Sequence, residues 1–450
     1  MKVGLEIHVT LNTKSKLFCT CSTTNALPNT NVCEVCLGFP GSKPTVNKEA
    51  VRQCTLLARA LNFTVKNNLV FSRKSYFYPD LSKNYQITQF EEPLGVNGSI
   101  IADGNIRLKR IHLEEDPAQI IRNNKTLIDY NRSGMPLAEI VTEPDIKSAE
   151  QARLFMNKLS RILKYLNITD NVKADVNVSI KESGYSRCEI KNVTGFKDIE
   201  RAIISEAKRQ KKAVENNEKI QNATYGWDPL KQKTYVMRLK ESEADYGYIY
   251  DPDLPIIKIP TQFLKEKLPE LSDEKIARYT KQGVPLSDAD IIAQDKDIAE
   301  LFEQINLDPV FKAKWFRREI LRVLNYNNQT ILQSKFTKEN VSKVLNLVYD
   351  NKINEAVGKK LLEKLVVEDF DVEKHVKEHD LLKIDDSDLI KKVTAEVLKN
   401  NNSAVNDYLS GEQKALNFLF GLVMRQTKGK ADPGIIRENL QAELDKLKSK

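Results

Sequence analysis

Apolar and polar residues alternate with a period of two in several segments of the first ~280 residues, a period typical of half-buried strands. The clearest case is Ala174–Ile180, where alanine, valine and isoleucine alternate with Asp175, Asn177 and a serine. Val3–Leu11 and Ile106–Leu113 follow the same rule. The pattern predicts strands with one face in a core and the other presenting carboxylate, amide and hydroxyl groups.

Helical periodicity interrupts these strands and later replaces them. Glu150–Asn167 gathers its apolar residues on one side, and Asp198–Lys212 carries a second helix signal. From about Pro285 onward nearly every segment is predicted to form an amphipathic helix with a charged outer face, and Ser287 is the expected N-cap of the first of these helices. We therefore expect an α+β fold followed by helices.

Changes in the pattern of predicted strands and helices along the chain predict three domains. The first, residues 1–282, is the α+β body, and residues 283–384 form a helical connector. An acidic stretch then precedes a small helical tail, residues 385–450, whose helices are separated by a basic turn at Lys428–Pro433.

Composition excludes several classes of protein. Of the 450 residues, 41% are apolar and 29% are charged. This composition is sufficient to bury a hydrophobic core and is not that of a low-complexity chain. The longest apolar run, Phe418–Met424, is too short for a membrane-spanning helix, and the N-terminus lacks the pattern of an export leader. We expect a soluble, cytoplasmic protein. The net charge of +8 is compatible with a polyanionic partner but also with an ordinary basic surface.

All six cysteines lie before residue 189, and four of them are clustered. The clustered residues are Cys19, Cys21, Cys33 and Cys36. Paired thiols at short spacing in a chain without an export signal favour a metal over disulfides. We expect a structural Zn²⁺ that stabilises the polar loop Ser22–Val32, and we expect Cys54 and Cys188 to be small buried residues.

Acidic side chains and histidines recur in three strand-like segments. They are Glu6 with His8; His112 with Glu114, Glu115 and Asp116; and Glu139 with Glu143 and Asp145. Oxygen-rich groups with an occasional imidazole suit hard divalent cations, and Mg²⁺ commonly accompanies nucleotide phosphates. The alternative is that the segments are unrelated or ion-paired surface charges.

The chain contains neither of the glycine-rich phosphate-binding motifs, so metal and basic side chains would have to hold a nucleotide. The candidates are Arg132, Arg187 and Lys191, which could equally form surface ion pairs. Two further groups have a structural and a functional interpretation. The aromatic residues Tyr76, Tyr78, Tyr85 and Phe90 could stack on bases or support a loop, and His375 with His379 could bind a metal or lie on a solvated helix face.

Taken together, these segments resemble the B subunits (GatB) of the aspartyl/glutamyl-tRNA(Asn/Gln) amidotransferases. The similarity runs through the whole chain in order. It is carried by VGLEIHVTL, the C-x-C…C-x2-C insertion, FYPDLSKNYQITQF, HLEEDPA, DYNRSGMPLAEIVTEPDI, ADVNVSI, SRCEIKNVTGF, MRLKESEADYGYIYDPDLP and KALNFLFGLVMRQTKGKADP. The related E subunits carry a large insertion for which this chain has no room.

The resemblance implies a glutamine-synthetase-like cradle that holds Mg²⁺ and ATP, followed by helices and a YqeY-like tail that contacts tRNA. It implies a ligase that phosphorylates the side-chain carboxylate of Glu-tRNA(Gln) or Asp-tRNA(Asn) and then amidates it. On the family pattern, Mg²⁺ is held by Glu6, His8, Glu115 and Glu139, with Glu114 as the alternative to Glu115 and Glu143 as the alternative to Glu139. Arg132, Arg187, Lys191 and Asn177 would face the phosphates or the aminoacyl end.

Ammonia must come from elsewhere, because the chain lacks the Ser-Ser-Lys arrangement of an amidase. The resemblance therefore implies a glutaminase (A) subunit and a small C subunit as partners in a heterotrimer. Two other functions remain to be weighed: a tRNA-binding scaffold without catalytic activity, and a free-standing ligase for a small molecule. The sequence does not decide between the two misacylated tRNAs.

Overall fold

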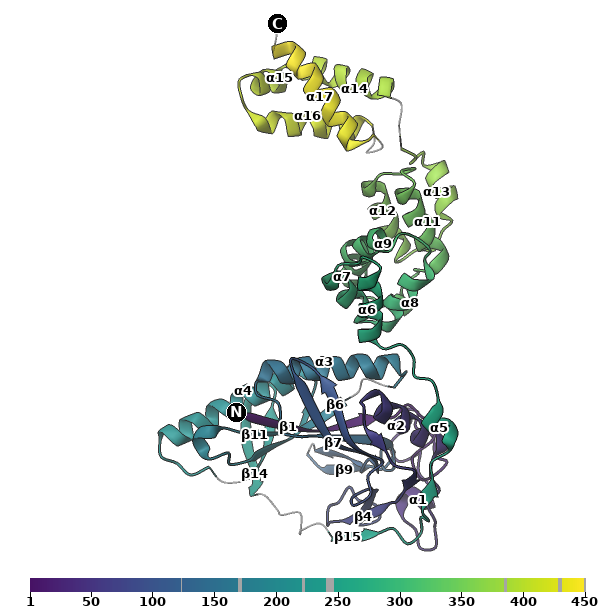
Figure 1. Ribbon diagram of the computed structural model, residues 1–450, viewed down its shortest axis with the longest axis vertical. Helices are drawn as coiled ribbons and strands as arrows, with labels where there is room; N and C mark the ends of the chain where they lie inside the picture. Colours follow the sequence, from purple (N-terminus) through teal and green to yellow (C-terminus); the bar gives the residue numbers. More distant parts are fainter. Residues whose placement is uncertain are drawn as a thin grey trace. The chain divides into compact units, whose positions relative to one another are not determined.

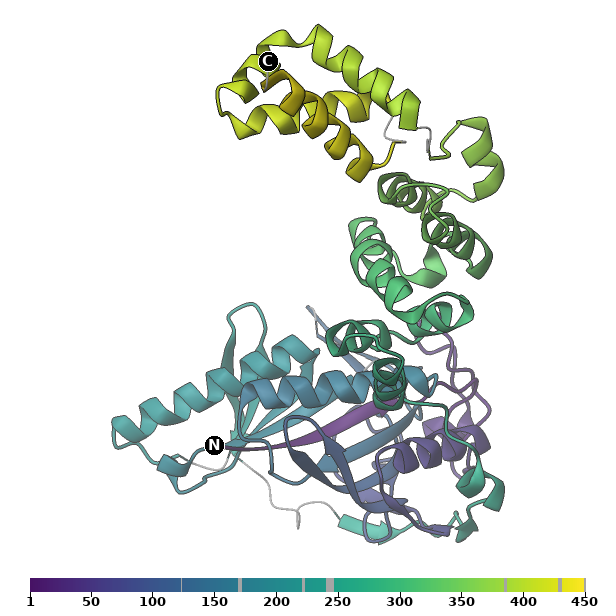
Figure 2. The ribbon, with the colours of Figure 1, turned by 45° about the horizontal axis from the view of Figure 1, so that its top comes forward.

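The computed structural model describes residues 1–122, 124–168, 172–220, 223–239, 247–383, 387–427 and 431–448 (Figures 1 and 2). The chain forms two compact units, Met1–Leu271 and Ser272–Lys450. The predicted boundary between connector and tail falls on residues 384–386, and residues 428–430 belong to the predicted basic turn; both segments lie outside the described residues.

A nine-stranded sheet is the frame of the first unit. In spatial order its strands are β14 (Lys233–Leu239), β13 (Ala223–Asp228), β12 (Cys188–Thr194), β11 (Val172–Ser179), β1 (Lys2–Thr10), β10 (Pro136–Thr142), β7 (Asn105–Glu115), β6 (Gly95–Ile101) and β2 (Thr64–Val65). All neighbours are antiparallel except β12 and β13. The three strands that alternation predicts are confirmed as β1, β7 and β11, and together with β10 they form the centre of the sheet.

One face of this sheet is apolar and is covered by helices (Figure 1). These are α2 (Lys48–Ala60), α3 (Ala149–Tyr165) and α4 (Phe196–Glu215). On β1, the odd-numbered residues Val3, Leu5 and Ile7 are fully buried in this core, which leaves the even-numbered side chains on the other face. Ser148 caps α3 by accepting a hydrogen bond from the Gln151 amide. The predicted strand alternation and helices thus produce a sheet with one polar face.

Shorter elements complete the first unit. They are the three-stranded sheet β15 (Gly247–Tyr250), β4 (Ser72–Ser75) and β5 (Tyr85–Thr88); the pair β16 (Ile257–Lys258) and β3 (Asn68–Leu69); the hairpin β8 (Gln119–Arg122) and β9 (Thr126–Asp129); and the short helices α1 (Glu34–Leu37) and α5 (Thr261–Lys265). Cys54 on α2 and Cys188 on β12 are fully buried, as predicted.

The second unit is helical and contains two separate apolar cores. The first core belongs to α6 (Ser272–Lys281), α7 (Leu286–Ala293), α8 (Lys296–Gln304), α9 (Pro309–Trp315), α10 (Leu321–Tyr326), α11 (Lys338–Tyr349), α12 (Glu355–Leu365) and α13 (Val372–Glu378). The second belongs to α14 (Ser387–Asn400), α15 (Asn402–Leu409), α16 (Gln413–Gln426) and α17 (Pro433–Lys448).

The expected cap at Ser287 is wrong. Pro285 is the N-cap of α7, and Ser287 lies inside the first turn, where its hydroxyl donates to Asp288. Among the described helices, none combines the length and apolar character that crossing a bilayer requires.

Candidate active site

The polar face of the sheet brings residues from distant parts of the sequence into one row. His8 on β1 lies opposite Glu139 on β10, and Glu139 lies opposite His112 on β7. On the other side of His8, Lys173 on β11 continues the row. Because side chains of directly opposed residues lie on the same face of a sheet, these four groups meet at one surface.

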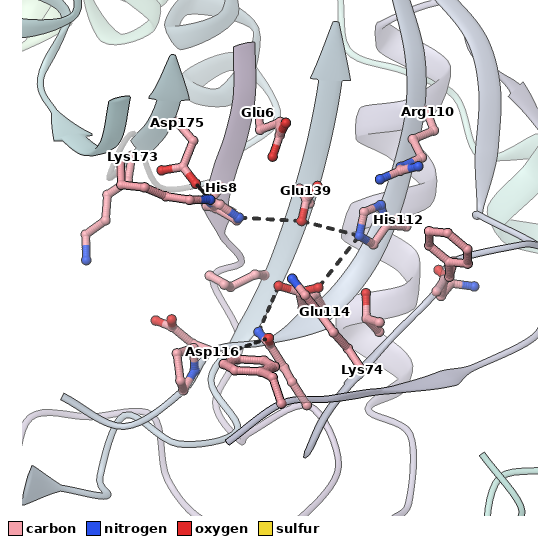
Figure 3. Close-up of a pocket in the computed structure, with 18 of the residues that line it drawn as sticks. Glu6, His8, Lys74, Arg110, His112, Glu114, Asp116, Glu139, Lys173 and Asp175 are labelled. Atoms are coloured by element: carbon pink, nitrogen blue, oxygen red, sulfur yellow. Dashed lines mark hydrogen bonds and ion pairs between the residues drawn. The ribbon is translucent and has the colours of Figure 1, made fainter. Parts of the chain in front are cut away.

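A first acidic cluster forms around this row (Figure 3). It consists of His8, Glu114 and Glu139, whose ligand atoms all lie within 4.8 Å of one another. Glu139 Oε2 lies 3.5 Å from Nε2 of both His8 and His112. Glu114 Oε1 accepts a 2.8 Å hydrogen bond from Gln86 Nε2, which fixes the carboxylate in the wall of the cavity.

The two imidazoles and the carboxylate stabilise each other's charged forms. Burial alone would raise the pKa of Glu139, but the neighbouring imidazoles of His112 and His8 outweigh burial and hold it well below its usual value. Burial alone would lower the pKa of His8, but its hydrogen bond to Glu139 and the nearby negative charges raise it to about 9. In this arrangement Glu139 is a carboxylate and His8 is protonated at neutral pH.

A second acidic cluster lies next to the first, on β1, β11 and β12. Its members, Glu6, Asp175 and Glu189, also place their ligand atoms within 4.8 Å of one another. Lys191 Nζ lies between two of them, 2.6 Å from Asp175 Oδ2 and 2.9 Å from Glu189 Oε1. Burial and the surrounding carboxylates, Glu139 first among them, raise the pKa of Glu6. Three carboxylates at this spacing fit a divalent cation with oxygen ligands.

Two more predicted residues complete the second cluster. Arg187 Nη2 lies 3.2 Å from Glu6 Oε1, and Asn177 Nδ2 donates to the same oxygen at 3.2 Å. Arg187 Nε in turn donates to Asn177 Oδ1 at 2.6 Å. The fourth predicted residue, Arg132, pairs with Asp116 on another wall of the cavity.

The structure does not bring every predicted residue to this face. Glu115 follows Glu114 on β7, so its side chain lies on the opposite face, where its carboxylate binds Lys83 Nζ at 2.7 Å and accepts from the Ile87 amide at 2.8 Å. Glu143 follows the end of β10 and does not line the cavity that the described residues form. The geometry therefore favours Glu114 over Glu115, and Glu139 over Glu143, as ligands.

Sequence reasoning missed Asp175 and Glu189 as candidate ligands. Both were visible as polar members of alternating strands, but their proximity to Glu6 depends on the register of β11 against β1 and β12. His112 was noted only for its acidic neighbours, and it bridges Glu139 and Glu114. Its Nδ1 is buried without a hydrogen-bond partner in the described part of the chain.

Both clusters lie in one cavity of about 560 Å³. Besides the acidic groups, its walls carry basic and aromatic side chains, namely Lys74, Arg110, Arg132, Lys173, Arg187, Lys191, Tyr76, Phe90 and Tyr248. This volume lies within the range of pockets that hold small molecules and cofactors. Anionic clusters flanked by cations can hold a metal–phosphate group and stabilise charge on a transferring phosphoryl group.

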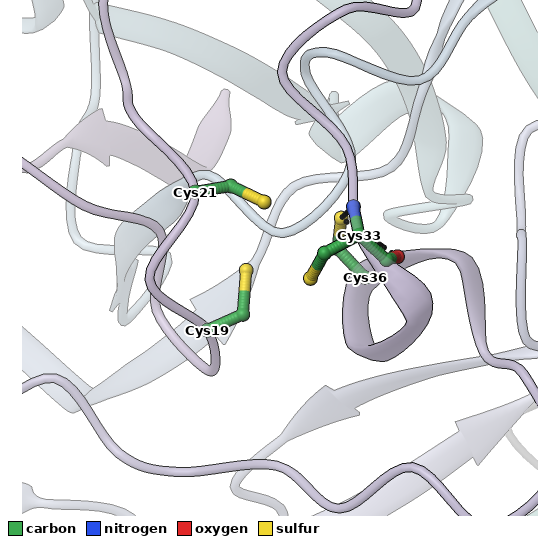
Figure 4. A group of neighbouring side chains, drawn as sticks. All are labelled: Cys19, Cys21, Cys33 and Cys36. Atoms are coloured by element: carbon green, nitrogen blue, oxygen red, sulfur yellow. Dashed lines mark hydrogen bonds between the residues drawn. The ribbon is translucent and has the colours of Figure 1, made fainter.

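The four clustered cysteines form a separate candidate metal centre (Figure 4). The Sγ atoms of Cys19, Cys21, Cys33 and Cys36 all lie within 4.8 Å of one another. None of the four forms a disulfide in the structure. Hydrogen bonding from Cys19 and the nearby Lys16 charge lower the pKa of the Cys36 thiol to about 4. Four sulfur ligands, one of them a thiolate, fit a closed tetrahedral Zn²⁺ site.

Lys16 is a fully buried lysine beside this centre. Its Nζ contacts Cys36 Sγ at 3.5 Å and the Tyr130 carbonyl oxygen at 3.3 Å. The loop between the cysteine pairs also binds the segment before Arg132, since Asn31 N donates to Asn131 Oδ1 at 2.8 Å. The cysteine centre therefore supports the segment that carries Arg132 to the cavity wall.

The histidine pair and the aromatic group, for which the sequence left two interpretations each, differ in where they lie in the structure. The rings of His375 and His379 lie 4.0 Å apart on α13 and its C-cap, and no third metal ligand joins them among the described residues. Of the aromatic group, Phe90 and Tyr76 line the cavity, whereas the Tyr85 ring at the start of β5 lies under the guanidinium of Arg73 on β4.

Comparison with known proteins agrees with the extent of both units. A family model described as the GatB/GatE catalytic domain matches residues 1–265, and one described as the GatB domain matches residues 296–444. The B subunit of the aspartyl/glutamyl-tRNA(Asn/Gln) amidotransferase of Thermotoga maritima is 38% identical over 474 residues, covering 98% of each chain. The protein of the same name from Thermus thermophilus is 39% identical over 458 residues, covering 97% of each.

Proposed function

The chain belongs to the GatB family, the B subunits of aspartyl/glutamyl-tRNA(Asn/Gln) amidotransferases, and on this premise we propose how its cavity forms Gln-tRNA(Gln) or Asn-tRNA(Asn). The observation that carries the proposal is the pair of acidic clusters on one polar sheet face, flanked by basic side chains in one cavity. A scaffold without catalytic activity would not need this arrangement.

The reaction has two steps. A side-chain carboxylate oxygen of the misacylated tRNA attacks the γ-phosphorus of ATP; a P–O bond forms to the carboxylate and the bond to ADP breaks. Ammonia then attacks the carbonyl carbon of this acyl phosphate, phosphate leaves with the bonding pair, and the nitrogen loses a proton to give the amide. The first step is needed because an unactivated carboxylate has no adequate leaving group.

Glu6, Glu114 and Glu139, joined by Asp175 and Glu189, would hold Mg²⁺, and His8 would join them as a ligand by releasing its proton when the ion binds. When bound, Mg²⁺ neutralises phosphate charge and aligns the phosphoryl group for in-line transfer. His8 and His112 hold Glu139 ionised, so that the carboxylate is available at neutral pH. Lys191 keeps Asp175 and Glu189 together and offsets their repulsion.

Basic residues would bind the phosphates of ATP on the β12 side of the cavity. Arg187 and Lys191 already lie over the second acidic cluster, and Asn177 orients Arg187. Arg132, which pairs with Asp116 on another wall of the cavity, would add a further phosphate donor there. All four residues bind carboxylates in the structure, and incoming phosphate oxygens would compete for the same donors.

Three further parts of the proposal concern domains and metal. The predicted domains are a glutamine-synthetase-like cradle at residues 1–282, a helical domain at 283–384 and a YqeY-like tail at 385–450 that contacts tRNA. The first of these boundaries moves to residue 271, because Tyr279 on α6 belongs to the apolar core of the second unit. The separate apolar core of α14–α17 supports the last division. Zn²⁺ at the four cysteines is structural.

Partners follow from the chemistry. A glutaminase A subunit supplies ammonia and a small C subunit completes the heterotrimer, because this chain has no amidase nucleophile of the Ser-Ser-Lys type. Aminoacyl-tRNA is consumed at the ribosome, so the complex works in the cytoplasm as a glutamine-dependent carbon–nitrogen ligase.

The test is ATP hydrolysis and amide formation by the complex assembled with A and C subunits, using Glu-tRNA(Gln) and Asp-tRNA(Asn) separately. Wild type should hydrolyse ATP only when a misacylated tRNA is present. Glu139→Gln should remove this activity and retain tRNA binding, whereas Glu143→Gln, altered just beyond the same strand, should behave as wild type. Full activity of Glu139→Gln, or a wild-type complex that only binds tRNA, would contradict the proposal.

A further inference from the structure

Arg110 lies in the cavity wall but has no role in either acidic cluster. It precedes His112 by two residues on β7, so both side chains lie on the same face of the sheet. Across the sheet it lies opposite Val141 on β10, which in turn lies opposite Glu6. Figure 3 shows its guanidinium beside His112, and no dashed line reaches it.

The guanidinium of Arg110 lacks a polar partner in the described part of the chain. Its Nε is buried with no hydrogen-bond acceptor, and no described carboxylate forms an ion pair with it. By contrast, Arg132 and Arg187 both pair with carboxylates of the cavity. A partly buried guanidinium whose Nε has no acceptor is unfavourable, and an anionic ligand that accepts this hydrogen bond would remove the cost.

Aromatic side chains hold the guanidinium in place. Its central carbon lies over the Phe90 ring, 5.9 Å from the centroid. Phe90 is itself stacked on Tyr248, with centroids 3.9 Å apart and an angle of 12° between the rings. When a fixed aromatic ring orients an arginine, the N–H donors of its planar guanidinium point in one direction, which suits bidentate binding of a phosphate.

Arg110 and two of the predicted ATP-binding cations, Arg187 and Lys191, lie on different sides of the acidic clusters. Between β7 and β12 lie β10, β1 and β11, a separation of about 19 Å at the usual strand spacing. Figure 3 likewise places Lys173 and Arg110 on opposite sides of Glu139. In-line phosphoryl transfer brings the attacking and leaving groups to opposite sides of the phosphorus. With the ATP phosphates on the β12 side, the β7 side is left for the acceptor.

We propose that Arg110 binds the phosphodiester of the 3′-terminal nucleotide of the acceptor tRNA, and that Phe90, stacked on Tyr248, positions its guanidinium. The inference rests on the proposed function, since that function supplies an RNA end that must enter the cavity. Arg110 fixes the last nucleotide of the RNA, and thereby the esterified amino acid, relative to the acidic clusters.

The test is a comparison of two RNAs and two variants in the complex assembled with A and C subunits. One RNA is full-length uncharged tRNA, and the other lacks its 3′-terminal nucleotide. Arg110→Met removes the proposed contact, and Lys109→Met removes an exposed charge from the neighbouring position of the same strand. Affinity is measured at several salt concentrations, and the KM values for ATP and aminoacyl-tRNA are measured separately.

Arg110→Met should lower affinity for full-length tRNA by roughly tenfold or more, as expected for a charged hydrogen bond. For the shortened RNA the loss of affinity should be under about twofold. For full-length tRNA, the slope of log K against the logarithm of the salt concentration should become shallower by about 0.7. The KM for ATP should be unchanged. Lys109→Met should match wild type in every measurement. If Arg110→Met does not fold, Arg110→Lys tests the same difference between the two RNAs with a smaller loss.

Equal losses with both RNAs would overturn the inference, as would a raised KM for ATP with unchanged tRNA binding, which would assign the phosphate to ATP. Failure of the proposed function is distinguishable from these results. A wild-type complex that hydrolyses no ATP with misacylated tRNA contradicts the function, whereas an Arg110 effect confined to full-length tRNA would still support the contact.

Discussion

Glu114 and Glu115 are consecutive residues of β7 whose carboxylates bind different partners on opposite faces of the sheet. Glu114 accepts from Gln86 and belongs to the first acidic cluster, whereas Glu115 forms an ion pair with Lys83 near the cysteine centre. The alternation of a strand makes this separation unavoidable. Two adjacent acidic residues therefore have separable functions.

Substituting each of these glutamates should separate chemistry from stability. Glu114→Gln should reduce aminoacyl-tRNA-dependent ATP hydrolysis by about 100-fold or more, because a ligand of the phosphoryl-transfer centre is lost. Glu115→Gln should leave a buried Lys83 without its partner, at a cost of about 3–5 kcal/mol in the free energy of unfolding. ATPase assays and urea denaturation measure the two effects. If Glu115→Gln instead reduced ATP hydrolysis and Glu114→Gln only lowered stability, Glu115 would be the ligand.

The stability of the metal-free protein should fall between about pH 6.5 and pH 9 because of His8. Its pKa is raised from 6.5 to about 9 in the folded chain, so folding favours the protonated form. The stabilisation by Glu139 is then fully present below about pH 6.5 and is lost as the pH rises through 9. Its size is at most about 3 kcal/mol.

Urea denaturation in EDTA at pH 6, 7.5 and 9 measures this dependence. His8→Gln should flatten the curve, leaving a smaller slope from His112, whose pKa is also raised against the effect of burial by Glu139 and Glu114. Identical slopes for wild type and His8→Gln would show that His8 does not titrate in this way.

The sequence predicted the central strands because their alternation depends only on which face enters the core. β1, β7 and β11 were therefore recognisable from Val3–Leu11, Ile106–Leu113 and Ala174–Ile180 alone. The four-cysteine centre was also predictable, since its ligands lie within eighteen residues of one chain segment, Cys19–Cys36. Local spacing is sufficient for such features.

Register and pairing order could not be predicted in the same way. Asp175 joins Glu6 only because β11 pairs with β1 in one register, and a shift by one residue would turn it into the core. The unpaired state of Arg110 in the described part of the chain is likewise a property of the folded cavity, since it depends on what distant strands place beside it. Resemblance to the family supplied ligands that spacing could not, but it did not separate Glu114 from Glu115.

Removing Lys191 should make the first unit depend more strongly on divalent cations. Its ammonium bridges Asp175 and Glu189, and Lys191→Met would leave three close carboxylates without that charge. We expect a lower Tm in EDTA and a larger rise in Tm on adding Mg²⁺ than wild type shows, because the ion would replace the missing charge. Thermal unfolding with and without Mg²⁺ measures this; an equal Mg²⁺ response in both proteins would contradict a cation site here.

The cysteine centre should contain about one zinc ion per chain. Cys33→Ser should lose most of the metal, and Lys16→Met should release it faster to a chelator, because the buried ammonium that contacts Cys36 offsets the negative charge of the thiolates. Cys54→Ala, which alters a buried cysteine outside the centre, should retain full zinc. Elemental analysis and chelator kinetics measure both quantities. Zinc-free wild-type protein purified without chelators would contradict the assignment.

Deleting the chain after residue 383 should weaken tRNA binding and leave phosphoryl transfer nearly intact. The deleted helices α14–α17 share their own apolar core, with Ile390, Leu419 and Leu440 fully buried, so the preceding helices retain theirs. In the complex with A and C subunits, the KM for aminoacyl-tRNA should rise by about tenfold, which corresponds to ~1.4 kcal/mol of lost binding, while kcat stays within about twofold. Thermal unfolding of the truncated complex checks that the remaining units fold. An unchanged KM would show that the tail does not contact tRNA, and a lost kcat with normal KM would place it in the chemistry instead.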